Sequence, residues 1–217
     1  MRKPVVDYRK FRLSKLNTPE FSHLKLLLGW VGYFALYFLT ENLIPAEKCH
    51  PIHCGLDDMI PFCEWFLLPY VFWYALIVFS LGYFALYDVG SFKKLQTFII
   101  ITQVVTMAVY ILYPKCQTQR HTEFPRDNFL TDCVGFLYAF DTNTGVCPSL
   151  HCAYSIGIAS VWLKAKDVSK IWKAFVVVAV ILICLSTMFI KQHSAEDFFA
   201  PLTVCLLAEI LVFKVFY

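Results

Sequence analysis

Hydrophobic positions fall in long runs along this chain, rather than in the short alternations of a soluble domain. Five runs reach or approach the ~20 residues that a helix needs to cross a bilayer. Each of them predicts a membrane-spanning helix. They are Leu24–Ile44, Trp65–Tyr87, Leu95–Tyr113, Ile171–Ile190 and Phe198–Tyr217.

A sixth run, Pro148–Leu163, is shorter and starts with the polar residues Ser149 and His151. Such a start is unfavourable against lipid, but an intramembrane histidine is tolerated where it faces other helices or a wet cavity. We therefore predict an all-α polytopic membrane protein. Its six transmembrane helices would form a bundle, with the functional site at their outer ends.

Composition agrees with this pattern, because 59% of the 217 residues are hydrophobic and only 16% are charged. No repeat and no Gly-, Ser- or Pro-rich linker divides the apolar part. We expect a basic cytoplasmic segment at residues 1–23 and one six-helix domain at residues 24–217. The first segment has no apolar stretch of the kind that a cleavable signal peptide requires.

Lysine and arginine concentrate before the first run and in every second loop. The positive-inside rule then places both termini in the cytoplasm and the other loops outside, and we expect the plasma membrane. Membrane lipids are the expected partners, since anionic headgroups would attract the basic segment. Nothing in the pattern indicates nucleic acid, and the sequence does not indicate a protein partner.

Three clusters of ionisable side chains lie in the outward loops, at Tyr113–Asn128, in "CPSLHC" and at Ser186–Asp197, and the last two contain the catalytic candidates. In "HSAED", His193 and Asp197 are four residues apart and would lie on one helical face, where the carboxylate could orient the imidazole. Its Nε2 would then be a free nucleophile or base. The alternative is that Ser194 to Asp197 form a capping box at a helix start, with His193 merely preceding it.

The second cluster is "CPSLHC", which starts at Cys147. Pro148 suits the first turn of a helix, and the unpaired amides beside Ser149 would attract an anion. His151 could give a proton to a leaving group. Alternatively, His151 is a structural histidine near the membrane interface.

Together, Pro148-Ser149-x-His151 and Ser186-Thr187-x5-His193-x3-Asp197 resemble two signature motifs of the type 2 phosphatidic acid phosphatase superfamily. This superfamily includes lipid phosphate phosphatases and inositol phosphotransferases, and the resemblance covers roughly the third to sixth predicted helices. It implies a six-helix core in which His193 attacks phosphorus and Asp197 orients it. His151 would protonate the leaving alkoxide, and Ser149 would hold phosphate oxygens.

The chain departs from the superfamily in two motifs. Alignment of the first motif on Arg120 leaves Tyr113 at the usual lysine and His121 at the usual proline. In the third motif, Thr187 stands where an arginine is usual. Candidates to replace the lost cations are Lys191 and Lys115, so the expected phosphate-binding residues are Ser149, Arg120 and Lys191.

We therefore expect a metal-independent lipid phosphate phosphatase or phosphotransferase that needs no cofactor and acts through a phosphohistidine. Water and an alcohol both remain open as the acceptor. Two other functions also remain open, a catalytically silent lipid binder of the same fold and a small transporter with a histidine proton relay. Because both histidines and the aspartate are present, the enzyme is favoured.

Three other features lead to expectations. The outward cysteines could form disulfides or remain thiols, which we favour over a zinc site in "CHPIHC". "GLDDMIPFCEW" could form a short helix capped by its acids, or a solvated loop. Glu209 would snorkel or approach Lys214 at the inner membrane surface. The outward cysteines are Cys49, Cys54, Cys63, Cys116, Cys133 and Cys147.

Overall fold

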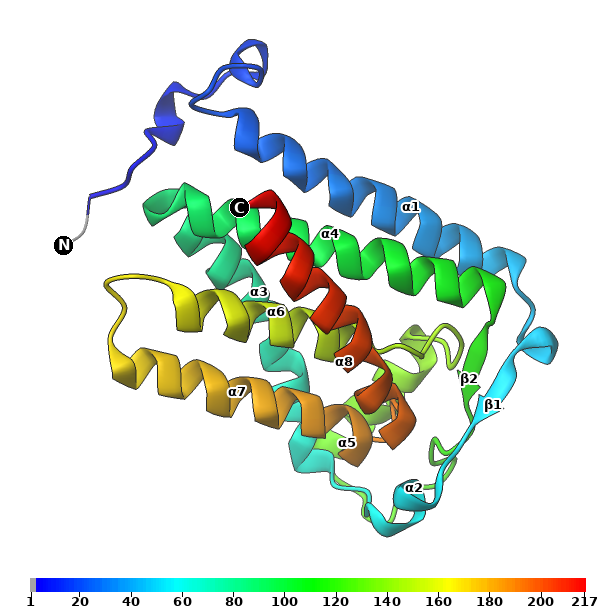
Figure 1. Cartoon of the computed structure of the whole chain (residues 1–217). Coiled ribbons are helices and arrows are strands. Elements are labelled where there is room, and N and C mark those ends of the chain that lie inside the picture. The colour runs from blue at the N-terminus through cyan, green and yellow to red at the C-terminus, as the bar shows by residue number, and fades with distance from the viewer. Residues whose placement is uncertain (1–2) are drawn as a thin grey trace.

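The computed structural model describes residues 3–217 as an all-α membrane protein with one small parallel sheet (Figure 1). The strands are β1, His50–Ile52, and β2, Lys115–Gln117. The helices are α1, Leu28–Leu43; α2, Gly55–Met59; α3, Leu67–Tyr87; α4, Val89–Leu112; α5, Phe129–Phe140; α6, Leu150–Lys164; α7, Lys170–Phe189; and α8, Ala195–Ile210.

Five helical stretches are long and apolar enough to cross a membrane, which confirms the five long hydrophobic runs. They are Ser22–Leu43, Glu64–Tyr87, Val89–Leu112, Lys170–Phe189 and Ala195–Phe216. α4 begins six residues before the predicted Leu95, because Asp88 caps it and accepts a hydrogen bond of 3.0 Å from the Ser91 amide. The first turns of α4 are polar, and hydropathy does not count them.

α6 has 15 residues and lies inside the bundle, where it packs against α3, α4, α7 and α8. The contact with α4 is close, since a Cβ atom at Gly157 would lie 2.5 Å from Cδ1 of Phe98. Most of the helix is therefore surrounded by protein. This explains how a short run with a polar start forms a helix here.

α1 lies along α4 at the side of the bundle, and none of its residues is buried (Figure 1). Its inner face is attached by ring packing and by a hydrogen bond: Trp30 packs on the Tyr154 ring, and its indole N–H donates to the Gln96 side chain at 3.1 Å. A helix exposed in this way needs lipid around its apolar side chains.

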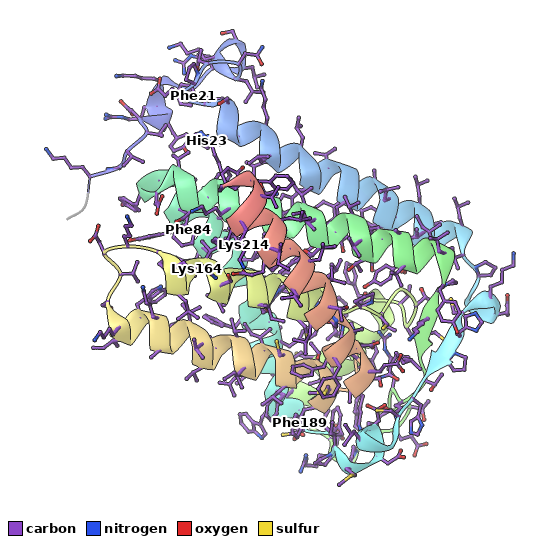
Figure 2. All side chains as sticks on the ribbon, in the orientation of Figure 1. Phe21, His23, Phe84, Lys164, Phe189 and Lys214 are labelled. Atoms are coloured by element: carbon purple, nitrogen blue, oxygen red, sulfur yellow. The ribbon has the colours of Figure 1, made fainter. Side chains whose placement is uncertain are left out.

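The basic N-terminal segment packs onto one end of α3. The Tyr8 hydroxyl lies 2.6 Å from Nε2 of His23 and donates to the Ala85 carbonyl at 2.9 Å. Phe21 is fully buried beside them. Figure 2 shows Phe21, His23 and Lys214 near the same end of the bundle, and Phe189 near the other.

The other end of the bundle contains the sheet, α2 and α5. α2 confirms the short helix predicted in this region. α5 was not predicted, although Asn128 caps it and accepts hydrogen bonds from the Leu130 and Thr131 amides. With 12 residues, α5 is shorter than the ~20 that a membrane span needs, so a search for long apolar runs does not find it.

The structure shows the partners of Glu209 and the state of the cysteines. Glu209 accepts hydrogen bonds of 2.6 Å from the Ser160 hydroxyl and the Lys164 ammonium, so the predicted approach to Lys214 is wrong. The reason is that α6 ends beside α8, which brings Lys164 within reach. All nine cysteines are free thiols in this structure.

Candidate functional site

The starts of α6 and α8 meet at one end of the bundle. Ser149 caps α6 by accepting a hydrogen bond of 3.4 Å from the Cys152 amide. Its own amide lies 3.3 Å from the Asp197 carbonyl in the first turn of α8. Pro148 precedes the cap and is not in the first turn, so that detail of the prediction is wrong. The two helix starts nevertheless bring both predicted motifs together.

His193 lies in the turn between α7 and α8, and not on a helix. α7 ends at Phe189, and Lys191 then takes the left-handed conformation with φ of 53°. The His193 amide donates to the Thr187 carbonyl at 2.9 Å, which fixes the turn. The prediction that His193 and Asp197 share a helical face is therefore wrong, because α8 begins only after Ser194.

The two side chains still meet. Nδ1 of His193 lies 3.3 Å from Oδ2 of Asp197, and this oxygen also accepts a hydrogen bond of 3.0 Å from the Ser194 amide. Asp197 is thus both the acid of a capping box and the partner of the imidazole. The capping box and the contact between His193 and Asp197 are thus both present, and the role of His193 as a nucleophile or base stays a prediction. In the described part of the chain, Oδ1 of Asp197 is buried without a hydrogen-bond partner.

His193 is nearly buried, with 9% of its surface exposed. Burial disfavours the imidazolium, but the hydrogen bond and the charge of Asp197 outweigh it and raise the pKa of His193. A proton held on Nδ1 by Asp197 leaves the lone pair on Nε2. This nitrogen lies 3.5 Å from the Ser149 hydroxyl, at the edge of hydrogen-bond range.

His151 faces His193, and their ring centroids are 6.0 Å apart. The His151 ring stacks on Tyr70 at 4.5 Å and lies 4.1 Å from the Trp73 ring. Its Nε2 is buried with no partner among residues 3–217. A buried imidazole nitrogen without a partner is unfavourable, so it is typical of a site that binds a polar ligand.

The two helix starts differ in their free amides. At α6, the Leu150 and His151 amides have no acceptor in the residues that the structure describes. At α8, the Ala195 amide donates to Oδ1 of Asp57 at 2.7 Å, and the Glu196 amide donates to the Ser194 hydroxyl. An anion would therefore find free donors at α6 and not at α8.

Arg120, a predicted phosphate ligand, points its guanidinium at the end of α5. It donates to the carbonyls of Tyr138, Asp141 and Thr142 at 3.2, 2.6 and 2.7 Å. Burial lowers the pKa of Arg120, and the nearby charge of Asp141 partly opposes this. Only its Nε lacks a partner in the described chain. Binding of phosphate by Arg120 stays a prediction.

Lys191 points its ammonium at α2, where it donates to the carbonyls of Asp57 and Ile60 at 2.8 and 2.6 Å. Burial lowers the pKa of Lys191, and the charges of Asp57 and Asp58 oppose this. Lys115, the other proposed replacement, forms an ion pair with Glu196. Both lysines thus have structural partners here, and a role for Lys191 in phosphate binding stays a prediction.

Sequence reasoning missed several residues around the site. Asp57 was expected in a short helix or a solvated loop with no role at the site, but only 3% of it is exposed and it accepts a hydrogen bond from the Ala195 amide at the start of α8. The Asp141 carboxylate accepts hydrogen bonds from the Tyr37 hydroxyl at 3.2 Å and from Nε2 of the Gln192 side chain at 3.0 Å. No local sequence pattern marks these contacts, because they join residues far apart in the chain.

The arrangement brings together an imidazole that contacts a carboxylate, a second imidazole 6.0 Å away, and the free amides at the start of α6. Comparison with family models, with curated proteins and with solved structures gives no match for this chain. Within residues 3–217, no group of three or more His, Cys, Asp or Glu side chains is placed to hold a metal ion. What the site does must therefore be argued from its geometry.

Proposed function

We propose that this protein is a membrane phosphatase or phosphotransferase that acts on lipid-linked phosphate esters through a phosphohistidine on His193. One observation carries the proposal. The rings of His193 and His151 lie 6.0 Å apart, Nε2 of His193 lies 3.5 Å from the Ser149 hydroxyl at the start of α6, and Asp197 contacts Nδ1 on the other side of the His193 ring. Phosphoryl transfer requires a nucleophile, a proton donor and hydrogen-bond donors for the phosphate oxygens.

In the first step, the lone pair of His193 Nε2 forms a bond to phosphorus while the bond to the lipid alkoxide breaks. The alkoxide takes a proton from the His151 imidazolium and leaves as an alcohol. The Tyr70 and Trp73 rings would stabilise that cation, and the phosphate dianion would supply its countercharge. Asp197 would stabilise the positive charge that develops on the His193 ring.

In the second step, neutral His151 takes a proton from water or from an alcohol, whose oxygen then attacks phosphorus. The bond between phosphorus and Nε2 breaks, and His193 returns to its neutral form. Water as acceptor makes the protein a phosphatase, and an alcohol makes it a phosphotransferase. The Ser149 hydroxyl and the Leu150 and His151 amides would hold the phosphate oxygens in both steps.

The proposal places the site at the outer face of the plasma membrane, with α6 as a sixth span and both termini in the cytoplasm. It is supported by the basic segment and Lys214, which lie at the end opposite Phe189 (Figure 2). Reporter fusions at both ends of the chain should remain in the cytoplasm. An external terminus would contradict this orientation.

The central experiment incubates the purified protein in detergent with a panel of lipid phosphates, with and without inositol. Free phosphate and new phospholipid are both measured. Labelled substrate should give an acid-labile, base-stable phosphoenzyme in the wild type and none in His193→Ala. His53→Ala is the matched control, since this exposed histidine pairs with Asp58 outside the site and should keep full activity. Turnover without a phosphoenzyme, or undiminished turnover in His193→Ala, would contradict the proposal.

A further inference from the structure

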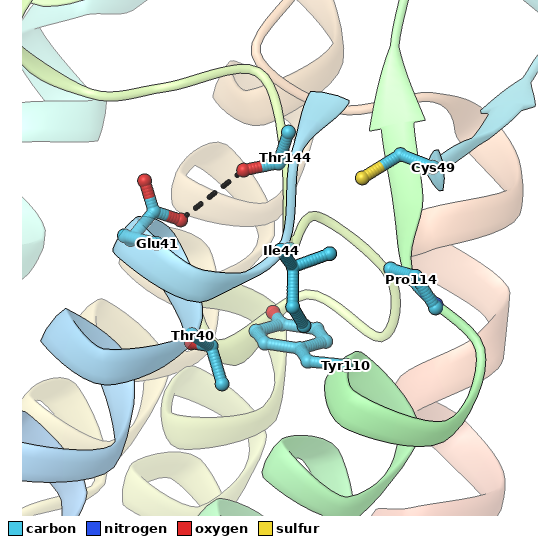
Figure 3. A pocket seen from close by; sticks show the side chains of 8 residues that line it. Thr40, Glu41, Ile44, Cys49, Tyr110, Pro114 and Thr144 are labelled. Atoms are coloured by element: carbon cyan, nitrogen blue, oxygen red, sulfur yellow. Dashed lines mark hydrogen bonds between the residues drawn. The ribbon is translucent and has the colours of Figure 1, made fainter. Parts of the chain in front are cut away.

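A polar hollow opens at the end of α1. Its volume is about 350 Å³, and its polar lining comes from the end of α1 and the loop before α6. A narrower cavity adjoins it, shares Glu41 and Thr144, and is lined by the Tyr110 ring (Figure 3). We call the two together the Glu41 pocket.

The hydroxyl donors of the Glu41 pocket are already used. The Thr142 hydroxyl donates to Oε2 of Glu41, and the Thr144 hydroxyl donates to Oε1 at 3.3 Å. A hydroxyl that donates its one hydrogen to a carboxylate can offer a ligand only its lone pairs. Both threonines therefore face a ligand as acceptors.

Each of the two amide side chains of the pocket uses one of its two N–H hydrogens in a hydrogen bond to a backbone carbonyl. Nδ2 of Asn42 donates to the Phe38 carbonyl at 2.6 Å, and Nδ2 of Asn143 donates to the Gln117 carbonyl at 2.9 Å. A carbonyl partner fixes which end of each amide faces it, so each Oδ1 is the end left over. The side-chain atoms available to a ligand are thus mainly oxygen acceptors.

The charge of Glu41 has no ion-pair partner in the part of the chain that the structure describes. Arg120 interacts with the same loop, but it donates to three backbone carbonyls and not to Glu41. A half-buried carboxylate surrounded by acceptors would be stabilised by a cation that donates hydrogen bonds.

We propose that the Glu41 pocket binds the protonated amine of a small ligand or a lipid headgroup. An ammonium group donates three hydrogen bonds and accepts none, which matches the acceptor lining. It would also neutralise Glu41 and contact the face of the Tyr110 ring. A neutral polyol would leave the carboxylate without a countercharge, and a divalent cation would find a single carboxylate in the pocket.

The Glu41 pocket is joined to the catalytic candidates at two points. Thr142 follows Asp141, whose carboxylate accepts a hydrogen bond from Gln192, the residue before His193. The Tyr110 hydroxyl donates to the Pro148 carbonyl at 2.9 Å, just before the α6 cap. A bound amine would then select the phosphate ester or the acceptor; this role rests on the proposed function, whereas the binding itself does not.

The test measures heats of binding for ethanolamine on protein in phosphatidylglycerol nanodiscs. Ethylene glycol is the neutral match of similar size, and inositol represents polyols. Ethanolamine should bind, and Glu41→Gln should weaken it at least tenfold, since the amide keeps the shape but removes the charge. Glu47→Gln, an exposed acid in the following turn, is the matched control and should bind like the wild type.

His193→Ala should bind ethanolamine normally, so loss of turnover and loss of binding are separable. Equal binding of ethylene glycol or inositol, unchanged binding in Glu41→Gln, or no binding of ethanolamine to the wild type would each overturn the inference, even in an active enzyme. Nanodiscs with phosphatidylethanolamine identify the source. A lower apparent affinity for ethanolamine there assigns the pocket to a lipid headgroup, and an unchanged affinity assigns it to a soluble amine.

Discussion

The carboxylate of Asp57 closes the start of α8 by accepting a hydrogen bond of 2.6 Å from the Ser194 hydroxyl. It accepts a second bond, of 2.7 Å, from the Ala195 amide. An acid from the segment between α1 and α3 thereby fixes the turn that holds His193. The carbonyls of Asp57 and Ile60 also hold Lys191 from the same turn, so α2 is attached to the site at both the carboxylate and the backbone.

Asp57→Asn should destabilise the fold and lower activity, although Asp57 is not one of the proposed catalytic residues. An amide that replaces the carboxylate places an N–H₂ group against the Ser194 hydroxyl or the Ala195 amide, which costs about 1–3 kcal/mol. Thermal unfolding in detergent measures the loss. Asp58→Asn is the matched control, since Asp58 is exposed and contacts His53; its stability should stay within about 0.5 kcal/mol of the wild type. Equal stability of both variants would contradict the capping role.

Asp57 should also contribute to the acid sensitivity of the fold. Burial opposes ionisation, but hydrogen bonds from Ser194, Ala195 and Cys54 outweigh it and lower the pKa of Asp57 below 3.8. A carboxylate with a lowered pKa stabilises the folded state above its unfolded pKa, and this stability is lost as the pH falls through the folded pKa. Unfolding measured below about pH 4 should therefore show a smaller pH dependence in Asp57→Asn than in the wild type. Identical dependence would exclude this contribution.

The sequence predicted which residues meet at this end of the molecule better than it predicted their geometry. Four-residue spacing correctly paired His193 with Asp197, yet the contact forms across a helix cap and not along a helix. The chain reversal at Lys191 depends on a left-handed residue and on a hydrogen bond to Thr187, and neither has a hydropathy signal. The four-residue spacing therefore identified His193 and Asp197 as partners, but it did not predict the backbone conformation between them.

Long-range polar contacts could not be predicted. Asp57 and Ser194 are 137 residues apart, and only the packed bundle brings them together. The same holds for Arg120 and Lys191, which the sequence offered as free cations. Their donors bind carbonyls at the ends of α5 and α2, because a helix ends with carbonyls that require partners. Sequence reasoning counted charges without seeing these competing acceptors.

Asp197→Asn should remove the negative charge beside His193 while it keeps the hydrogen bond that caps α8. Oδ2 of Asp197 accepts from both Ser194 and His193, so an asparagine can turn its carbonyl toward both and keep the cap. Stability should change little, while turnover should fall at least tenfold because the cationic His193 ring loses its countercharge. Asp197→Ala should lose the cap and the activity together. Unchanged turnover in Asp197→Asn would remove Asp197 from the mechanism.

The pH profile of the same variant provides a further check. Asp197 raises the pKa of His193, and attack requires the neutral ring. On the acid side, kcat/KM falls as His193 of the free enzyme becomes protonated. The midpoint of this fall should therefore lie above pH 6.5 in the wild type and at a lower pH in Asp197→Asn. A midpoint that stays in place would mean that another group controls it.

The two histidines should respond differently to the leaving group. His151 is proposed to protonate the departing alkoxide, so His151→Ala should slow turnover of an alkyl lipid phosphate by ~10²–10⁴-fold. A nitrophenyl phosphate ester, if accepted, releases a phenolate that needs little protonation, and this variant should recover part of its rate there. His193→Ala should not recover, because it lacks the nucleophile with either ester. Equal recovery in both variants, or none in either, would contradict the separate roles.

Tyr70→Phe is the control for disturbed packing: it keeps the ring that stacks on His151, so its ratio of rates on the two esters should match the wild type.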